Sequence, residues 1–510
     1  MNRLFDYLHQ NPLFRSLAER FDVLNKDLHI QNTTEENALL ALAYAYHEHP
    51  KQMFLVTGNL YGAQLAYDRL SQIFPPEEVC LFPQDEFITS ELLVSSMEFR
   101  MERMNTIRRI LTGKPCLIVT HPAGLLKPEL NKEAWRDAIF TIREGDFLDR
   151  DELASKLMNL GYTREYVVEK PGDYSVRGGI VDVYPLGSLN PIRLDFFGDE
   201  IETIKSFDLD TQRSLERVQE VVISPMNEFL YSEKELAQLH ELIQYKMSQI
   251  PFSEEAKKRI QQDLDDLDNH ANLDRLARYI PFLTPNKSTI LDLATNPQIW
   301  FLDHHRILDQ IDLMSSEIGE WYLSTDDYPR MGFDLMYAMT DLRIDHAVYV
   351  DYFEYLGVHP QAEKISLFGK EVLSYQGNTK LFVQDMRSEI GRKTLVLAVS
   401  SYKERSALTA LFEEENIPYM LLGDNDKLRE NQVNILINSS YFDLTSDVLN
   451  LRVISSQTIF QSKSIRRKGR YVSVYQTSKR LSSVNDLQPG DYVVHYDYGI
   501  GKFLEIIPAV

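Results

Sequence analysis

The chain has 510 residues, of which 44% are hydrophobic and 25% are charged, a composition that permits several packed cores and excludes wholesale disorder. A formal net charge of −22 repels phosphate backbones at long range, so nucleic acid can be held only by a local basic patch. The two cysteines are too few for a disulfide framework or a thiolate zinc site. The N-terminal residues lack the long apolar core of a signal peptide, and no run reaches the roughly 18 apolar residues that membrane crossing needs. We therefore expect a soluble, cytoplasmic protein with no membrane partner.

At about 150 residues per domain, this length predicts three or four domains. Residues 1–140 alternate short apolar runs with longer helical patterns, which is the spacing of a mostly parallel sheet covered by helices. The runs that carry this pattern are Phe54–Val56, Ala63–Phe74, Ser95–Leu111 and Leu117–Val119.

Residues 141–222 form a small α+β module inserted after the first sheet. It begins with a helix from Asp151 to Leu160, for which Gly161 provides the C-cap. Three strands follow, joined by a proline-containing loop and a Gly198-Asp199 turn. We place these strands at about Val176–Tyr184, Ile192–Phe197 and Ile201–Phe207.

The second of these strands carries an unusual alternation. A period of two directs Ile192, Leu194 and Phe196 to one face, and Arg193, Asp195 and Phe197 to the other. A large aromatic residue thus shares the charged face. Either Phe197 packs beneath a neighbouring element, or it belongs to a protein-binding surface, where an exposed aromatic ring beside arginine is typical.

Residues 223–345 are acidic and largely helical, with a long helical pattern at Ser253–Leu276 and a short apolar run around Ile299 that fits a strand. A separate α/β domain is expected at residues 346–460. Its strand-helix-strand alternation is carried by Thr394–Val399, Tyr402–Glu415 and Val433–Ile437.

Residues 461–484 are a basic linker, with seven Lys or Arg residues and no acid between Lys463 and Arg480. It is either merely solvated or in contact with nucleic acid through Arg466, Arg467, Lys468 and Arg470. Residues 485–510 begin a new unit. A strand at Tyr492–His495 is followed by a turn at Gly499-Ile500-Gly501.

The sequence has no strong nucleotide-binding, catalytic or metal-binding motif, so we expect no catalytic residue and no metal site. None of the three Gly-Lys pairs is followed by the Ser or Thr of a phosphate-binding loop, and Gly58–Gly62, although placed between a strand and a helix, lacks the lysine. Asp85-Glu86 follows a proline and fits a loop better than the acidic pair of a motor. Asp303-His304-His305 fits a surface histidine pair better than a metal site.

The quoted residues resemble a known family, the N-terminal half of bacterial transcription-repair coupling factor, also called Mfd. The resemblance spans essentially the whole chain. Its most specific parts are Gly172–Tyr174, Arg177–Pro185, Arg193–Glu202 and Phe207-Asp208. Supporting matches are Phe82-Pro83, Asp85-Glu86, Glu98–Arg103, Leu487–His495 and Gly499–Gly501.

This resemblance implies a module similar to the repair protein UvrB. Residues 1–140 and 223–345 are then the two parts of a degenerate nucleotide-binding-like α/β domain. The inserted module recruits UvrA through Arg177, Arg193 and Phe197. The resemblance also implies that residues 485–510 are the first strands of a β-barrel-like RNA-polymerase-interaction domain, and we expect weak or absent polymerase binding from this incomplete unit.

Because the quoted matches cover only the N-terminal half of the family, we expect this chain to lack the family's motor and its regulatory domain. We therefore expect a non-enzymatic adaptor that needs no cofactor, because ATP and magnesium serve only the missing motor. Rival interpretations are an ATP-dependent helicase or translocase, using Gly58–Gly62, and a DNA-binding scaffold. Replacing Arg193 and Phe197 together should abolish UvrA binding without lowering the melting temperature. Whether Arg177 shares their face depends on strand register, which the sequence does not fix.

Overall fold

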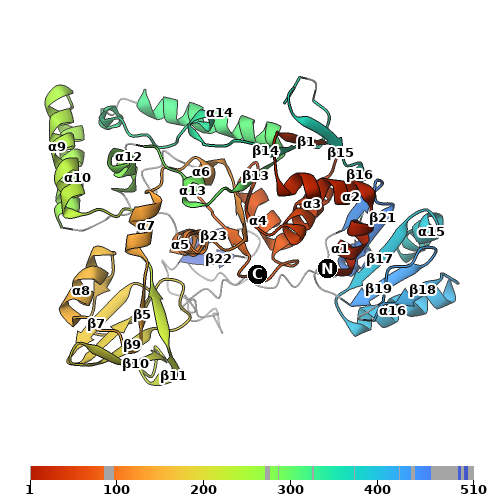
Figure 1. Ribbon diagram of the computed structural model, residues 1–510, viewed down its shortest axis with the longest axis horizontal. Helices are drawn as coiled ribbons and strands as arrows, with labels where there is room; N and C mark the ends of the chain where they lie inside the picture. Colours follow the sequence, from red (N-terminus) through yellow and green to blue (C-terminus); the bar gives the residue numbers. More distant parts are fainter. Residues whose placement is uncertain are drawn as a thin grey trace, which may run out of the picture. The chain divides into compact units, whose positions relative to one another are not determined.

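The computed structural model describes residues 2–85, 97–269, 276–284, 286–323, 327–355, 357–372, 374–423, 426–437, 443–460, 492–495 and 499–502. The chain forms two compact units, residues 1–462 and 463–510. The first unit contains three larger sheets, one two-stranded ribbon and many helices (Figure 1). The predicted class, an α/β multidomain protein, is confirmed. Within the described ranges, none of the helices combines the length and apolar character that crossing a membrane requires.

The first sheet has seven strands in the order β15-β1-β14-β13-β2-β4-β3, and all of its neighbouring pairs are parallel. The strands are β1 (Leu28–Gln31), β2 (Gln52–Val56), β3 (Val79–Leu81), β4 (Cys116–Thr120), β13 (Gln298–Leu302), β14 (Ala347–Val350) and β15 (Glu363–Ser366). Every residue of β2, β4 and β13 is buried, because helices cover both faces of a parallel sheet.

The helices associated with this sheet come from the chain before and after the inserted module. They are α1 (Asn2–Gln10), α2 (Pro12–Asp22), α3 (Glu35–Glu48), α4 (Leu60–Leu70), α5 (Met97–Leu111), α6 (Pro122–Leu125), α7 (Lys132–Ala138) and α14 (His304–Tyr322). The strands and helices expected around Phe54, Ala63, Ser95, Leu117 and Ile299 correspond to β2, α4, α5, β4 and β13.

The start of the second α/β domain differs from the sequence-based boundary at residue 346. Strand β14 pairs with β1 and β13, and β15 pairs with the other edge of β1, so both strands complete the first sheet. A four-residue apolar run such as β14 fits either sheet equally well, and only long-range pairing decides between them. The second α/β region therefore begins after β15.

The inserted module leaves and returns through a two-stranded antiparallel ribbon, β5 (Phe140–Arg143) with β12 (Glu220–Ile223). Between them lies a six-stranded sheet in the order β11-β10-β9-β8-β7-β6. Its strands are β6 (Thr163–Arg164), β7 (Asp173–Arg177), β8 (Ile180–Val183), β9 (Ile192–Phe197), β10 (Glu200–Phe207) and β11 (Ser214–Val218). Helix α8 (Arg150–Asn159) buries Leu153 and Leu157 in the same apolar cluster as the inner face of this sheet.

Two tight turns shape the module. The Gly198 turn is confirmed, with Gly198 at φ +64° between β9 and β10. The single strand predicted from Val176 to Tyr184 is wrong, because Gly178-Gly179 forms a two-residue turn that separates β7 from β8. Gly178 has φ +58°, a conformation that glycine adopts at little cost and that a hairpin turn requires.

The segment that follows the module is largely helical, as expected. Its elements are α9 (Glu233–Gln249), α10 (Glu254–Asp268), η1 (Ala277–Tyr279), α12 (Ile280–Leu283), α13 (Ile290–Leu293), η2 (Tyr328–Met331) and η3 (Met339–Asp341). Ser232 begins α9 with a capping box, in which its hydroxyl and the Glu235 carboxylate each satisfy a backbone N–H of the first turn.

The third sheet is mixed, in the order β16-β20-β21-β17-β19-β18. Its elements are β16 (Gly369–Lys370), α15 (Thr379–Glu389), β17 (Thr394–Val399), α16 (Tyr402–Glu414), β18 (Tyr419–Leu421), β19 (Val433–Ile437), β20 (Leu444–Ser446), β21 (Leu451–Ser455) and α17 (Ser456–Phe460). This region is less separate than expected, because one apolar cluster contains residues of α1, α3 and β21. The Tyr7 hydroxyl and the Asn37 amide each donate to a backbone carbonyl of this region, those of Leu449 and Thr445, at 3.0 Å.

In the second unit, β22 (Tyr492–His495) pairs antiparallel with β23 (Gly499–Lys502). The predicted strand at Tyr492 is present. The turn predicted at Gly499-Ile500-Gly501 is wrong, because these residues belong to β23. The β-barrel-like unit expected here stays a prediction.

Candidate partner-binding face of the inserted module

The strand register of the module brings the three predicted contact residues to one face. Arg177 lies opposite Ile180, which lies opposite Asp195, so Arg177 has the same parity as Arg193 and Phe197. The other face holds Tyr174, Val181, Leu194 and Ile204, all buried in the apolar core. We call the side that carries Arg177, Asp182, Arg193, Asp195, Phe197, Glu200 and Lys205 the polar face.

A buried carboxylate organises the two arginines. Asp182 lies opposite Arg193 in the register, and its side chain is fully buried. Arg193 donates from Nε to Asp182 Oδ1 at 2.7 Å and from Nη2 to Oδ2 at 2.9 Å. Arg177 donates from Nη2 to Asp182 Oδ2 at 2.5 Å. One carboxylate therefore fixes two guanidinium groups side by side.

The two arginines differ in how much they offer a partner. The Arg193 side chain is only 16% exposed, donates to the Gln212 carbonyl at 3.3 Å and lies 4.7 Å above the centre of the Phe207 ring. Its hydrogen bonds to Asp182 raise its pKa. The Arg177 side chain is 37% exposed, and its other N–H groups make no hydrogen bond within the described residues. Arg177 therefore has more N–H groups available to a binding partner than Arg193 has.

Phe197 is 78% exposed, so the interpretation that it packs beneath a neighbour is wrong. The Gly178-Gly179 turn explains part of this exposure. The Gly179 carbonyl accepts from Phe196 N at 2.7 Å, which places the two glycines beside the end of β9. Because neither glycine has a side chain, nothing there covers the ring.

The geometry changes one expectation from the sequence. Removing Arg193 would leave the fully buried Asp182 with a single ionic partner, Arg177, and an incompletely paired buried charge destabilises a fold. The Arg193 and Phe197 double change should therefore lower stability as well as binding. Sequence reasoning missed Asp182, although an acid between two valines in a buried strand predicts a buried charge that needs a partner.

The loop after β2 leads to the N-terminus of α4, the place where the sequence suggested a phosphate site. The Asn59 side chain accepts from Gly62 N at 2.8 Å and so caps α4. A Cβ placed on Gly58 would lie 3.0 Å from Cγ and Cδ of Arg306, whose side chain therefore lies against the loop. At the N-terminus of α4, where a phosphate could bind, the Gly62 N–H is thus already satisfied by the chain's own Asn59 side chain.

Asp303-His304-His305 does not form the surface histidine pair that the sequence predicts. His304 is buried rather than on the surface, and its Nδ1 lies 3.0 Å from Nε2 of His359. Burial lowers the pKa of His304 to about 4. Among the residues that the structure describes, no group of three His, Cys, Asp or Glu side chains is arranged to hold a metal ion.

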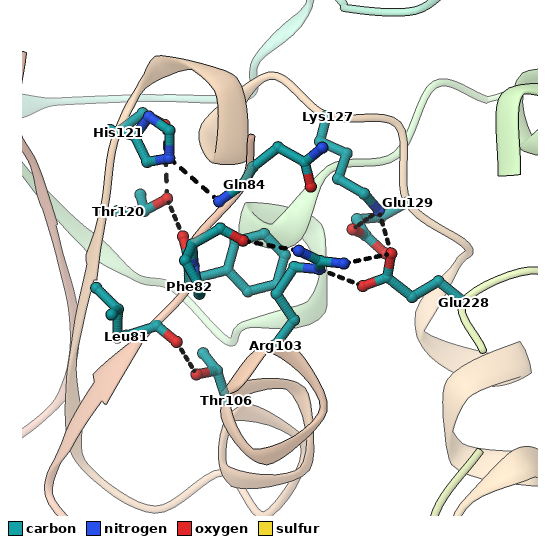
Figure 2. Close-up of polar contacts among 11 residues, drawn as sticks. Leu81, Phe82, Gln84, Arg103, Thr106, Thr120, His121, Lys127, Glu129 and Glu228 are labelled. Atoms are coloured by element: carbon teal, nitrogen blue, oxygen red, sulfur yellow. Dashed lines mark hydrogen bonds and ion pairs between the residues drawn. The ribbon is translucent and has the colours of Figure 1, made fainter. Parts of the chain in front are cut away.

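A buried ionic cluster lies where the chain returns from the module (Figure 2). Arg103 donates to the Glu228 carboxylate at 2.5 and 3.2 Å and to the Pro83 carbonyl at 2.9 Å. Lys127 Nζ lies 2.5 Å from Glu129 Oε1 and 3.2 Å from Glu228 Oε2. We call Arg103, Lys127, Glu129 and Glu228 the core cluster. It joins α5 to Glu228, which follows the exit strand β12 by five residues.

The two carboxyl groups of the core cluster have opposite pKa shifts. Burial raises the pKa of Glu129 to about 7. Burial acts in the same direction on Glu228, but the charges of Arg103 and Lys127 outweigh it and lower the pKa to about 2. Asp85 lies in the loop after β3, as expected, whereas Glu86 lies outside the described residues.

With this geometry in view, the family comparisons place the face within a known domain. Residues 140–229 match the UvrB interaction domain, and residues 487–509 match the CarD-like/TRCF RID domain. The polar face thus lies within the segment that is similar to the UvrB interaction domain.

The relatives extend the likeness to almost the whole chain. The transcription-repair-coupling factor of Bacillus subtilis (strain 168) is 28% identical over 471 residues, which cover 89% of this chain and 40% of the relative. That of Staphylococcus haemolyticus is 26% identical, with 98% of this chain and 44% of the relative covered. The resemblance to the N-terminal half of the transcription-repair-coupling factors is confirmed. The chain spans about two fifths of the length of these curated relatives.

Arg466, Arg467, Lys468 and Arg470 lie outside the described residues. Their contact with nucleic acid, and a weak role for DNA as a partner, stay predictions.

Proposed function

We propose that this chain is a non-catalytic adaptor of transcription-coupled DNA repair that binds UvrA through the polar face of the inserted module. Arg177 and Arg193 pair with acidic groups of UvrA, and Phe197 fills an apolar pocket. The observation that carries this proposal is the fully buried Asp182, which holds two arginines on the same face as a 78% exposed phenylalanine. Preorganised arginines beside an exposed ring are the composition of a binding hot spot.

RNA polymerase is the second proposed partner. Its support is the match of residues 487–509 to the CarD-like/TRCF RID domain, which contains β22 and β23. We propose that this segment gives the chain a weak contact with RNA polymerase. The adaptor would thereby link UvrA to a stalled polymerase.

We also propose that the chain works without ATP or another cofactor. The Asn59 cap supports this, because its side chain accepts from the Gly62 N–H that a nucleotide phosphate would otherwise bind. An ATP-dependent helicase is the rival. ATP with magnesium should leave the melting temperature of the chain unchanged, and a rise of several degrees would favour the rival.

Arg177 provides the test of UvrA binding. Arg177→Ala should weaken binding at least about tenfold, because a charged hydrogen bond to the partner is lost while Asp182 keeps Arg193. The matched control is Arg164→Ala. Arg164 is exposed on β6 opposite Tyr174, whose side chain is in the core, so it lies on the other face by parity. Titration of UvrA onto each variant gives the affinities, and equal affinities for both would contradict the proposal.

A further inference from the structure

A second exposed phenylalanine lies on the polar face, in a part of the chain that the sequence did not single out. Phe147 is 78% exposed, as Phe197 is. It follows the entry strand β5, and residues 145–148 pair with the start of β10. Backbone hydrogen bonds fix this pairing: Gly145 N to the Ile201 carbonyl at 2.8 Å, Ile201 N to the Asp146 carbonyl at 3.0 Å, and Leu148 N to the Asp199 carbonyl at 2.8 Å.

The strand register places Phe147 on one side of Glu200 and Phe197 on the other. Glu200 lies opposite Phe147 on one side and opposite Phe197 on the other. Residues directly opposite each other in a sheet point to the same side, and neighbouring strands are about 4.8 Å apart. The two phenylalanines are therefore about 10 Å apart along a row whose centre is Glu200. We call Phe147, Glu200 and Phe197 the aromatic row.

None of the three side chains is engaged within the part of the chain that the structure describes. The Glu200 side chain is exposed and takes part in no ion pair or side-chain hydrogen bond there, and neither ring stacks on another ring or receives a cation. Their backbones, by contrast, are fixed by strand pairing. A row that is rigid in its backbone and free in its side chains is preorganised to receive a ligand.

The chemistry of the row favours a cation. An ammonium or guanidinium group binds over an aromatic face within about 6 Å of the ring centre, and the backbones of the two phenylalanines lie about 5 Å on either side of the Glu200 backbone. Glu200 supplies the opposite charge at that midpoint. The neighbouring residues Asp146 and Asp199 add negative charge, whereas Arg177 and Arg193 are paired with Asp182 and Lys205 is paired with Asp195.

We propose that the aromatic row binds a lysine or arginine side chain of UvrA between the Phe147 and Phe197 rings, with the Glu200 carboxylate as its counter-ion. This inference rests on the proposed function, because it takes UvrA as the partner. It adds to the polar face a second contact region, which binds a group of the opposite charge. Arg177 and Arg193 meet acidic groups at one end, and the aromatic row holds a basic side chain at the other, which fixes the orientation of the partner.

The test uses the full chain and purified UvrA, with the affinity measured for each variant. Phe147→Ala should weaken binding about tenfold. Phe147→Leu keeps an apolar side chain but has no π face, and it should weaken binding by nearly as much. Glu200→Gln removes the counter-ion and should weaken binding about threefold to tenfold. Tyr166→Ala is the matched control, because Tyr166 is 82% exposed on the same module but outside the row.

The outcomes separate this inference from the proposed function. Wild-type affinity of Phe147→Ala or Glu200→Gln, together with loss of binding in Arg177→Ala, would overturn the cation site and leave the proposed function standing. Wild-type affinity of Phe147→Leu with weak binding of Phe147→Ala would mean that UvrA inserts an apolar group, which also overturns it. If Arg177→Ala binds normally as well, both proposals fail. Phe147, Glu200 and Tyr166 are exposed, so unchanged melting temperatures confirm that the variants at these three positions are folded.

Discussion

Two clusters in this chain join arginine to carboxylate, and they differ in which partner is buried. In the core cluster, Arg103 is 1% exposed and Glu228 is buried with it, so every donor is turned inward. In the polar face, the acid is buried and the arginines reach the surface, where Arg177 keeps unpaired N–H groups within the described residues. The same ion pair is thus built for stability in one place and for recognition in the other.

This difference separates two kinds of mutational effect. A substitution in the core cluster should lower stability and leave the affinity of the remaining folded protein unchanged. A substitution at the outer end of the polar face should lower affinity alone. Arg193 lies between these extremes, because it is mostly buried and belongs to the proposed contact surface.

The largest effect is expected for Arg103→Ala. It leaves Glu228 buried with only Lys127 as an ionic partner, and breaking a buried pair costs about 3–5 kcal/mol of unfolding free energy. Chemical denaturation of the full chain measures this loss. Arg136→Ala, which changes an exposed arginine on α7, is the control and should change stability by no more than about 0.5 kcal/mol. A loss below about 1 kcal/mol for Arg103→Ala would show that the cluster is not structural.

A smaller effect should distinguish the two arginines of the polar face. Arg193→Ala removes both hydrogen bonds of a bidentate pair from Asp182 and should cost about 2–3 kcal/mol. Arg177→Ala removes one bond from a half-exposed side chain and should cost less than about 1 kcal/mol. The melting temperatures of the two variants check this order. The reverse order would contradict the view that Asp182 depends mainly on Arg193.

The pH dependence of stability should reveal the core cluster. Because the pKa of Glu129 is raised from 4.5 to about 7, the folded chain keeps a proton that the unfolded chain releases. Stability from this group is therefore greatest below about pH 4.5 and falls as the pH rises to 7, by about 1–3 kcal/mol.

Glu129→Gln tests this dependence, because glutamine keeps the shape and cannot lose a proton. Thermal unfolding between pH 5 and 7.5 should show a flatter profile for the variant than for the wild type. Glu77→Gln, a change at an exposed glutamate, should keep the wild-type profile. Identical profiles for wild type and Glu129→Gln would mean that Glu129 is ionised throughout this range.

Local pattern in the sequence predicted much of the fold and part of the face. Apolar runs predicted β2, β4 and β17, and a period of two placed Arg193 with Phe197. These features depend on neighbours a few residues apart. The sequence leaves the face of Arg177 open, because this face depends on the turn at Gly178-Gly179, and the apolar pattern alone predicts continuous strand there.

The features that the sequence missed depend on distant pairing. Strand β15 joins β1 across more than 330 residues, and Phe147 joins Glu200 across about 50. Asp182 becomes the centre of the face only because β7 and β9 flank β8. Register and strand partners are set by the whole fold, and no local pattern contains them.

The central claim is that the polar face binds UvrA, and the affinity of Phe197→Ala for UvrA tests it most directly. Phe197 is exposed and makes no ring contact within the described residues, so its removal should leave the melting temperature unchanged. We expect the affinity to fall at least about thirtyfold, as for a central aromatic anchor worth about 2 kcal/mol. An unchanged affinity in a folded Phe197→Ala chain would contradict the claim.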